Sequence, residues 1–178
     1  MEFKNSVFIA TSLDGFIADK NGEIEWLTSI PNPDQNDMGY HAFMDSIDAL
    51  VMGRVTYETV LGFGGEWPYS KPVFVLSNTL ESIPDYLNEK VFLIHGNPKE
   101  ILETIHSKGL NRLYIDGGKT IQSFMKEGLI NELIITTITI LLGSGFSLFG
   151  DLNIPIHFEL KSSKVYLNQY VQNHFVKS

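Results

Sequence analysis

Residues 48–58 read DALVMGRVTYE, a stretch in which an apolar run leads into Gly-Arg. The run at 49–53 is typical of a buried strand, and a short helix is expected over 56–61. Carried outward along the chain, the same reasoning predicts more strands at 7–11, 72–77, 91–95, 113–115 and 133–142. It predicts helices over 34–47, over 98–106, and from Gly117-Gly118 to near Gly128.

Strands alternate with helices up to residue 130, which predicts an α/β domain with a mostly parallel sheet. The segment 155–176 alternates in two stretches around Ser162-Ser163 and predicts an antiparallel hairpin at one edge. Segment 13–33 contains Asp-Gly and Asn-Gly pairs and is expected to be a long functional loop. Asp34 or Asn36 is expected to cap the helix that follows it. We expect residues 1–178 to form a single domain.

Composition excludes several classes of function. The chain has 178 residues and a formal net charge of −8, which disfavours binding to nucleic acid. The absence of cysteine excludes disulfides, thiolate metal sites and a cysteine nucleophile. The five histidines show no metal-ligand spacing. With no apolar run of membrane-spanning length and no signal peptide, a cytoplasmic protein is expected.

Small, hydroxyl-bearing and cationic residues follow three of the expected strands. They are Gly53-Arg54-Val55-Thr56, Ser77-Asn78-Thr79 and Asp116-Gly117-Gly118-Lys119-Thr120. Ligands of open α/β sheets bind at the carboxyl ends of strands, and helix amino ends suit phosphate. The three segments therefore indicate a ligand with several phosphates, such as a dinucleotide. A plain turn at Gly117-Gly118 and a surface ion pair at Arg54 are the alternatives, and neither the P-loop nor the Rossmann glycine pattern is present.

Four stretches, at 10–18, 48–58, 75–80 and 115–120, carry a family resemblance, and a fifth lies at 142–149. In the order and spacing of these stretches, the chain resembles the dihydrofolate reductase superfamily. Within it, the chain is most similar to stand-alone relatives of the riboflavin-biosynthesis reductase domain. The resemblance implies a three-layer α/β/α fold with a mainly parallel central sheet of about eight strands. It also implies NADPH as the cofactor.

The resemblance assigns the cofactor-binding residues motif by motif. Cofactor phosphates are assigned to Gly53, Arg54 and Thr56. The adenosine end is assigned to Leu76, Ser77 and Asn78. The pyrophosphate is assigned to Gly117, Gly118, Lys119, Thr120 and Ile121. The nicotinamide is assigned to Ala10 and Ile17.

On the substrate side, the resemblance implies one acid on the helix before the second strand. Ungapped counting from Gly53 places it at Asp37, whereas a gap of two residues would place Gly39 there. A capping or solvated acid is the alternative interpretation of Asp37. Thr136 matches the threonine that supports that acid. Trp26 is expected to cover the substrate or simply to pack in its loop, and His41 lies on the same candidate helix. Phe63, Trp67 and Tyr69, in the glycine-rich loop, are expected either to line the site or to pack within the loop.

The expected function is NADPH-dependent reduction of a pyrimidine- or pteridine-like heterocycle. The only arginines are Arg54 and Arg112, none of them where folate enzymes hold the glutamyl tail, so a riboflavin-type substrate is favoured over dihydrofolate. A nucleotide-binding module without reductase activity, and a reductase of carbonyls or quinones, are the alternatives. The riboflavin-type relatives also imply a homodimer. The apolar stretch 134–142 suits either a shared sheet or a core strand.

Overall fold

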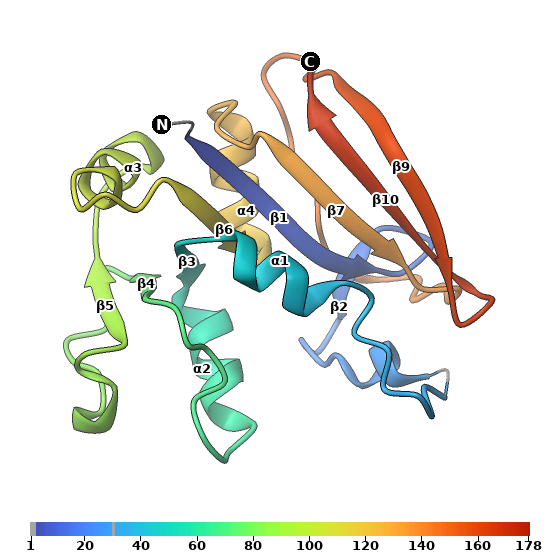
Figure 1. Ribbon diagram of the computed structural model, residues 1–178, viewed down its shortest axis with the longest axis horizontal. Helices are drawn as coiled ribbons and strands as arrows, with labels where there is room; N and C mark the ends of the chain where they lie inside the picture. The colour runs from blue at the N-terminus through green and yellow to red at the C-terminus, as the bar shows by residue number, and fades with distance from the viewer. Residues whose placement is uncertain (1–2, 30) are drawn as a thin grey trace.

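The computed structural model describes residues 3–29 and 31–178. Eight strands form one sheet in the order β5-β4-β3-β6-β1-β7-β10-β9 (Figure 1). The first six strands in this order, β5, β4, β3, β6, β1 and β7, run parallel, whereas β10 is antiparallel to both β7 and β9. The strands are β1 (Lys4–Thr11), β3 (Ala49–Gly53), β4 (Val73–Leu76), β5 (Val91–Ile94), β6 (Arg112–Asp116), β7 (Glu132–Thr137), β9 (Phe158–Tyr166) and β10 (Tyr170–Lys177). The predicted mainly parallel sheet with an antiparallel C-terminal pair is confirmed.

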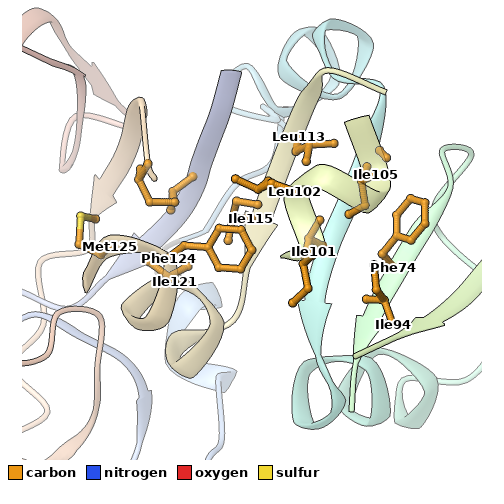
Figure 2. Packing of buried hydrophobic residues seen from close by; sticks show 14 of the residues in the cluster. Phe74, Ile94, Ile101, Leu102, Ile105, Leu113, Ile115, Ile121, Phe124 and Met125 are labelled. Carbon is orange, nitrogen blue, oxygen red and sulfur yellow. The ribbon is translucent and has the colours of Figure 1, made fainter. Parts of the chain in front are cut away.

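Helices cover both faces of the sheet and complete three layers. They are α1 (Tyr40–Ser46), α2 (Arg54–Gly62), α3 (Pro98–His106) and α4 (Gly118–Lys126), with 3-10 turns η1 (Glu25–Thr28) and η2 (Asp85–Leu87). Buried residues of α3 and α4 pack with Val51 and Ile115 on one face (Figure 2). Phe43 of α1 and Tyr57 of α2 pack on the other face, beside Leu50. We call these the α3/α4 face and the α1/α2 face.

The central strands are apolar throughout because both of their faces are covered. All four residues from Ala49 to Met52 are fully buried, which explains why residues 49–53 read as an unbroken apolar run. Helix α3 begins where predicted, because Asn97 and Glu100 form a reciprocal capping box around Pro98.

Three local predictions are wrong. Helix α1 starts at Tyr40 rather than 34, because Gly39 has a φ of +87° and interrupts the helix there. Neither Asp34 nor Asn36 caps it, and the Asn36 side chain accepts a hydrogen bond from the Met38 N–H instead. The hairpin turns at Leu167-Asn168, both with positive φ, so Ser162-Ser163 lies inside β9.

A further difference is a small second sheet. The expected loop at 13–33 contains β2 (Phe16–Asp19), which pairs with β8 (Gly145–Ser147). The expected strand at 133–142 accordingly ends at Thr137, and the chain then crosses to β8. We call the β2–β8 pair the flap. In the described part of the chain, no helix combines the length and apolarity that crossing a membrane requires.

A buried ionic network joins three strands near the amino end of β7. The Glu132 carboxylate accepts hydrogen bonds from Lys4 Nζ at 2.8 Å, Ser6 Oγ at 2.6 Å and His174 Nε2 at 2.7 Å. Burial raises the pKa of Glu132, but the hydrogen bonds from Lys4 and Ser6 outweigh it, and the net pKa lies below the usual value of 4.5. The carboxylate form therefore stabilises the fold.

We predict that Glu132→Gln lowers the free energy of unfolding at pH 7 by about 2–4 kcal/mol, because it leaves buried donors without their charged acceptor. Since the folded pKa is depressed, this stabilisation is complete above pH 4.5 and is lost as pH falls through the folded pKa. Urea denaturation at pH 7 and pH 3.5 measures both. Glu159→Gln, in the exposed pair with Lys161, is the control and should leave unfolding unchanged. An equal loss in both variants would contradict the role of the network.

Candidate active site

Two strand-to-helix turns lie side by side at the carboxyl edge of the sheet. Strands β3 and β6 are neighbours with Met52 opposite Asp116, so the turns that begin α2 and α4 are adjacent. A Cβ on Gly53 would lie 2.9 Å from Thr120 Oγ1, and a Cβ on Gly117 would lie 2.2 Å from Thr56 Oγ1. Each glycine therefore makes room for the threonine of the other helix, and we call this arrangement the glycine–threonine interlock.

The interlock brings two helix amino ends together. Neither α2 nor α4 has a side-chain cap, so within residues 3–29 and 31–178 no side chain accepts a hydrogen bond from the N–H groups of their first turns. Gly117 has a φ of +86°, a conformation that a side chain rarely adopts. Adjacent uncapped amino ends, with close backbone approach allowed by glycine, are suited to bind a phosphate-bearing group. The residues present thus fit the pyrophosphate of a dinucleotide.

The structure groups most of the predicted cofactor residues around this interlock. Leu76 pairs with Gly53 across the sheet, and Ser77 follows it, with its hydroxyl accepting from the Thr79 and Leu80 N–H groups. Asn78, which follows Ser77, and Lys119, which follows Gly118, are exposed to solvent. Arg54 opens α2 and forms a half-exposed ion pair with Glu58. The pair matches the surface interpretation of Arg54 and leaves its assignment to phosphate a prediction.

Ile121 stands apart from the other predicted cofactor residues. Its side chain is fully buried in the core under the α3/α4 face. Its N–H donates to the Gly117 carbonyl as part of α4. The fold therefore gives Ile121 a packing role, and it offers no free group to a pyrophosphate.

The flap contacts α4 close to the glycine–threonine interlock. Ile17 of β2 lies against Gly118, since a Cβ there would be 2.8 Å from Ile17 Cδ1. The Gln122 side chain on α4 donates to the Ser147 carbonyl of β8 at 2.8 Å. Ala10 pairs with Thr136 between β1 and β7, so the predicted nicotinamide and substrate residues are neighbours on the sheet. Gln172 Nε2 donates to Thr136 Oγ1 at 3.0 Å and to the Met38 carbonyl.

Asp37 caps the start of α1. Its carboxylate accepts from the backbone N–H groups of His41 and Gly39 and contacts His41 Nδ1 at 2.6 Å. These hydrogen bonds lower the pKa of Asp37 to about 2, so the group is ionised at neutral pH and holds no proton to donate. The arrangement matches the capping interpretation of Asp37. It also orients the exposed ring of His41.

Sequence reasoning missed a different acid, Asp116. Asp116 ends β6 directly before Gly117, on the α1/α2 face. The residue is partly accessible to solvent, but protein atoms crowd around its carboxyl group. Burial raises the pKa of Asp116 to about 6, although the Gly117 N–H and the Tyr114 hydroxyl partly offset it. An acid before Gly-Gly at a strand end was visible in the sequence, but its burial was not.

Tyrosines surround Asp116. The fully enclosed Tyr114 belongs to the same strand, and its hydroxyl donates to the Phe8 carbonyl at 2.8 Å. Burial, with a smaller contribution from the charge of Asp116, raises the pKa of Tyr40 to about 12. Burial and the same charge also raise the pKa of Tyr69. No described cation contributes to the pKa of Asp116, so phenols and backbone form its surroundings.

Two tryptophans offer unused donors. Trp26 lies in η1, which is held over β10 by the hydrogen bond from the Tyr170 hydroxyl to the Leu27 carbonyl. The Trp26 Nε1 is buried without a hydrogen-bond partner. Trp67 Nε1 is likewise buried and unpartnered, and its ring contacts Tyr57 and Tyr69. Trp26 thus lies on the α1/α2 face, the face that carries Thr136 and Asp116. Among the described residues, no group of three or more His, Cys, Asp or Glu is placed to hold a metal.

The fold and this edge define a class of protein. A three-layer domain whose central sheet has this strand order, with uncapped helix ends and an acid at the carboxyl edge of the sheet, is a dihydrofolate reductase-like α/β/α domain. The chain aligns in structure with dihydrofolate reductase from Enterococcus faecalis over 98% of its length and 96% of that chain, with a TM-score of 0.64 at 19% identity. At that identity the likeness concerns the fold.

Within that class, the chain belongs to the RibD C-terminal domain family, whose model matches residues 6–172. A protein from Shewanella sp. PV-4, named for riboflavin biosynthesis, is 51% identical over 98% of this chain and 99% of its own, with a TM-score of 0.95. YwjB of Bacillus subtilis is 35% identical over the full length of both chains. The deaminase and 5-amino-6-(5-phosphoribosylamino)uracil reductase of Thermotoga maritima shares the fold over 57% of its length, with a TM-score of 0.75 at 15% identity.

We predict that Asp116→Asn stabilises the protein at pH 8 by roughly 1–3 kcal/mol and has no effect at pH 4. Because the folded pKa of about 6 exceeds the usual 3.8, ionising Asp116 costs stability as pH rises from 3.8 through 6. An amide removes that cost. Urea denaturation at the two pH values measures the difference, with Asp151→Asn at an exposed position as control. A loss of stability at pH 8 would show that the carboxylate is well accommodated in the fold.

Proposed function

We propose that residues 1–178 act as one NADPH-dependent reductase domain that transfers hydride to a pyrimidine- or pteridine-like heterocycle. A riboflavin-biosynthesis substrate, a ribosylamino-pyrimidine carrying a phosphate, is favoured. The observation that carries the proposal is the pair of uncapped helix ends at the glycine–threonine interlock, directly beside the buried acid Asp116. Membership of the RibD C-terminal domain family supports it. The cytoplasm is the proposed location.

The cofactor is assigned to the residues around the interlock. Gly53, Thr56, Gly117 and Gly118 would hold its phosphates, with Leu76, Ser77 and Asn78 at the adenosine end and Ala10 and Ile17 at the nicotinamide. Bound NADPH supplies the hydride for a two-electron reduction. Arg54 and Lys119 are the cations at the two helix starts. One charge-assisted bond from Arg54 to the 2′-phosphate, roughly 1.5–3 kcal/mol, would favour NADPH over NADH about tenfold to a hundredfold.

Asp116 is the proposed proton donor. A carboxyl group whose pKa is about 6 holds a proton for an appreciable fraction of the time near neutral pH, as a general acid requires. The hydride and this proton together complete the two-electron reduction of the heterocycle. The aromatic surroundings, Tyr40, Tyr69 and Trp67, suit a planar ring. Asp37 is not proposed for this role, because its pKa is about 2.

Dihydrofolate is the second candidate substrate, and the arginines disfavour it. Arg54 is paired with Glu58 at the start of α2. Arg112 opens β6 at the opposite edge of the sheet from Asp116. Neither is therefore free beside Asp116 to hold the carboxylates of a glutamyl tail.

We predict that NADPH at about 100 times its dissociation constant stabilises the protein by roughly 2.7 kcal/mol and quenches tryptophan fluorescence. Arg54→Ala should bring the affinity for NADPH close to that for NADH. Arg112→Ala is the matched control, because it removes the same charge at the far edge of the sheet. With NADPH bound, Asp116→Asn should retain cofactor affinity and lose at least a hundredfold in turnover of the phosphoribosylamino-pyrimidine.

Other outcomes separate the alternatives. Good turnover of dihydrofolate would overturn the substrate preference. Tight NADPH binding with no reduction of any heterocycle would identify a nucleotide-binding module. Binding of neither NADPH nor NADH would overturn the reductase proposal itself.

The proposal includes a homodimer formed through the α3/α4 face. Two adjoining cavities lie on this face: one of about 210 Å³ beside α4, and one of about 360 Å³ over strands β7 and β10. Their lining is mostly apolar: Leu133, Ile135, Leu148, Phe149, Phe158 and Phe175. Leu160 pairs with Phe175 on the same face and is 57% exposed, and Ile154 is 72% exposed. A surface that offers both a groove and protruding apolar side chains suits a twofold contact with a second copy.

We predict a dimer in light scattering at micromolar concentration, and a monomer for Leu160→Glu, because a charge would be buried at the contact. Phe63→Glu is the control, since Phe63 is similarly exposed but lies in the loop after α2. A monomeric native protein, or a Leu160→Glu dimer, would contradict this assembly.

A further inference from the structure

The flap has little of its own to hold it in place. Its two strands share only three paired positions, with a register shift between Phe16 and Ala18. Both strands are short, and two-stranded sheets are marginally stable when isolated. Its position beside α4 therefore depends on ties to the rest of the chain.

We infer that Asp14 is a positioning residue, whose carboxylate clamps the turn after β1 to the loop before β8 and so holds the flap against the amino end of α4. Asp14 Oδ1 accepts from Ser12 Oγ at 2.6 Å and from the Leu142 N–H at 3.2 Å. Its Oδ2 accepts from the Gly143 N–H at 2.7 Å. One side chain thus joins segments that are 128 residues apart.

The clamp acts at both strands of the flap. Asp14 lies two residues before β2 begins, and Gly143 lies two residues before β8 begins. Next to it, the Leu148 N–H donates to the Gly15 carbonyl at 3.0 Å and closes the other end of β8. The Ser12 hydrogen bond and the two backbone N–H groups lower the pKa of Asp14, so the carboxylate is the form that the clamp uses.

Holding the flap fixes Ile17. This side chain touches Gly118, and the Ser147 carbonyl receives Gln122 from α4. Asp14 itself is exposed and carries none of the predicted cofactor contacts. Its effect on ligand binding must therefore pass through the flap. This step rests on the proposed function, because it takes the amino end of α4 as the cofactor site.

The test compares two aspartates of the same region. Asp14→Asn keeps the size of the side chain but replaces one oxygen by an amino group that cannot accept from the Leu142 or Gly143 N–H. We expect NADPH to bind roughly tenfold more weakly, the equivalent of one hydrogen bond. In the protein without cofactor, we expect the amides of residues 142–148 to exchange faster with deuterium.

Asp19→Asn is the matched control. Asp19 ends β2, and its Oδ1 accepts the Asn21 and Glu23 N–H groups at 2.7 and 2.9 Å, so it organises the turn that follows β2 without reaching residues 142–143. It should change NADPH affinity less than twofold. Ser12→Ala removes one hydrogen bond to Asp14 and leaves the two N–H bonds, so it should also retain the affinity. If Asp14→Asn also lowers the melting midpoint, Ser12→Ala shows whether the loss of affinity comes from the bonds to residues 142–143 or only from a weakened turn after β1.

Two readouts keep the inference distinct from the proposed function. Unchanged exchange at 142–148 in Asp14→Asn would overturn the clamp whether or not NADPH binds. Faster exchange with unchanged NADPH affinity would overturn its role in positioning the flap for the cofactor. Failure of the native protein to bind NADPH would count against the reductase, whereas the exchange comparison would still decide the clamp.

Discussion

The candidate site depends on the close contact of two turns. Gly53 lies against Thr120 and Gly117 against Thr56, at distances that leave no room for a Cβ. This contact is possible because β3 and β6 are neighbours and each leads directly into a helix. A larger residue at either glycine would push the two helix starts apart. The same contact sets the position of Asp116, which precedes Gly117 and lies next to Met52.

The two faces of the sheet differ in chemistry. The α1/α2 face carries Asp116, its tyrosines, Thr136 and the indoles with unused N–H groups. The α3/α4 face beyond α4 carries two cavities whose lining is mostly apolar. Because residues alternate along each strand, one strand serves both faces: in β7, Thr136 faces the site and Ile135 faces the groove. The proposed proton donor and the proposed dimer contact therefore lie on opposite faces of the same sheet.

Much of the fold was predictable because its central strands are buried on both faces and leave unbroken apolar runs, as at residues 49–53. Helix α3 was predictable from Asn97 and Pro98, which act locally. The flap was not, because its pairing joins segments more than 120 residues apart. The start of α1 depends on the backbone conformation of Gly39, and the hairpin turn on positive φ at Leu167, which sequence alternation does not reveal. For the site, the order of the glycine motifs was readable, whereas the acid character of Asp116 comes from burial that only the folded chain creates.

The place of β1 has a consequence for how the chain folds. Residues 4–11 are made well before their partners, yet they lie between β6 and β7 and pair with residues 112–114 and 132–137. During synthesis the first strand must wait until most of the chain has emerged before it gains either neighbour. Such long-range parallel pairing closes large loops and slows folding. An unpaired β1 is open to wrong partners for that interval, so folding of this domain should be sensitive to chaperones.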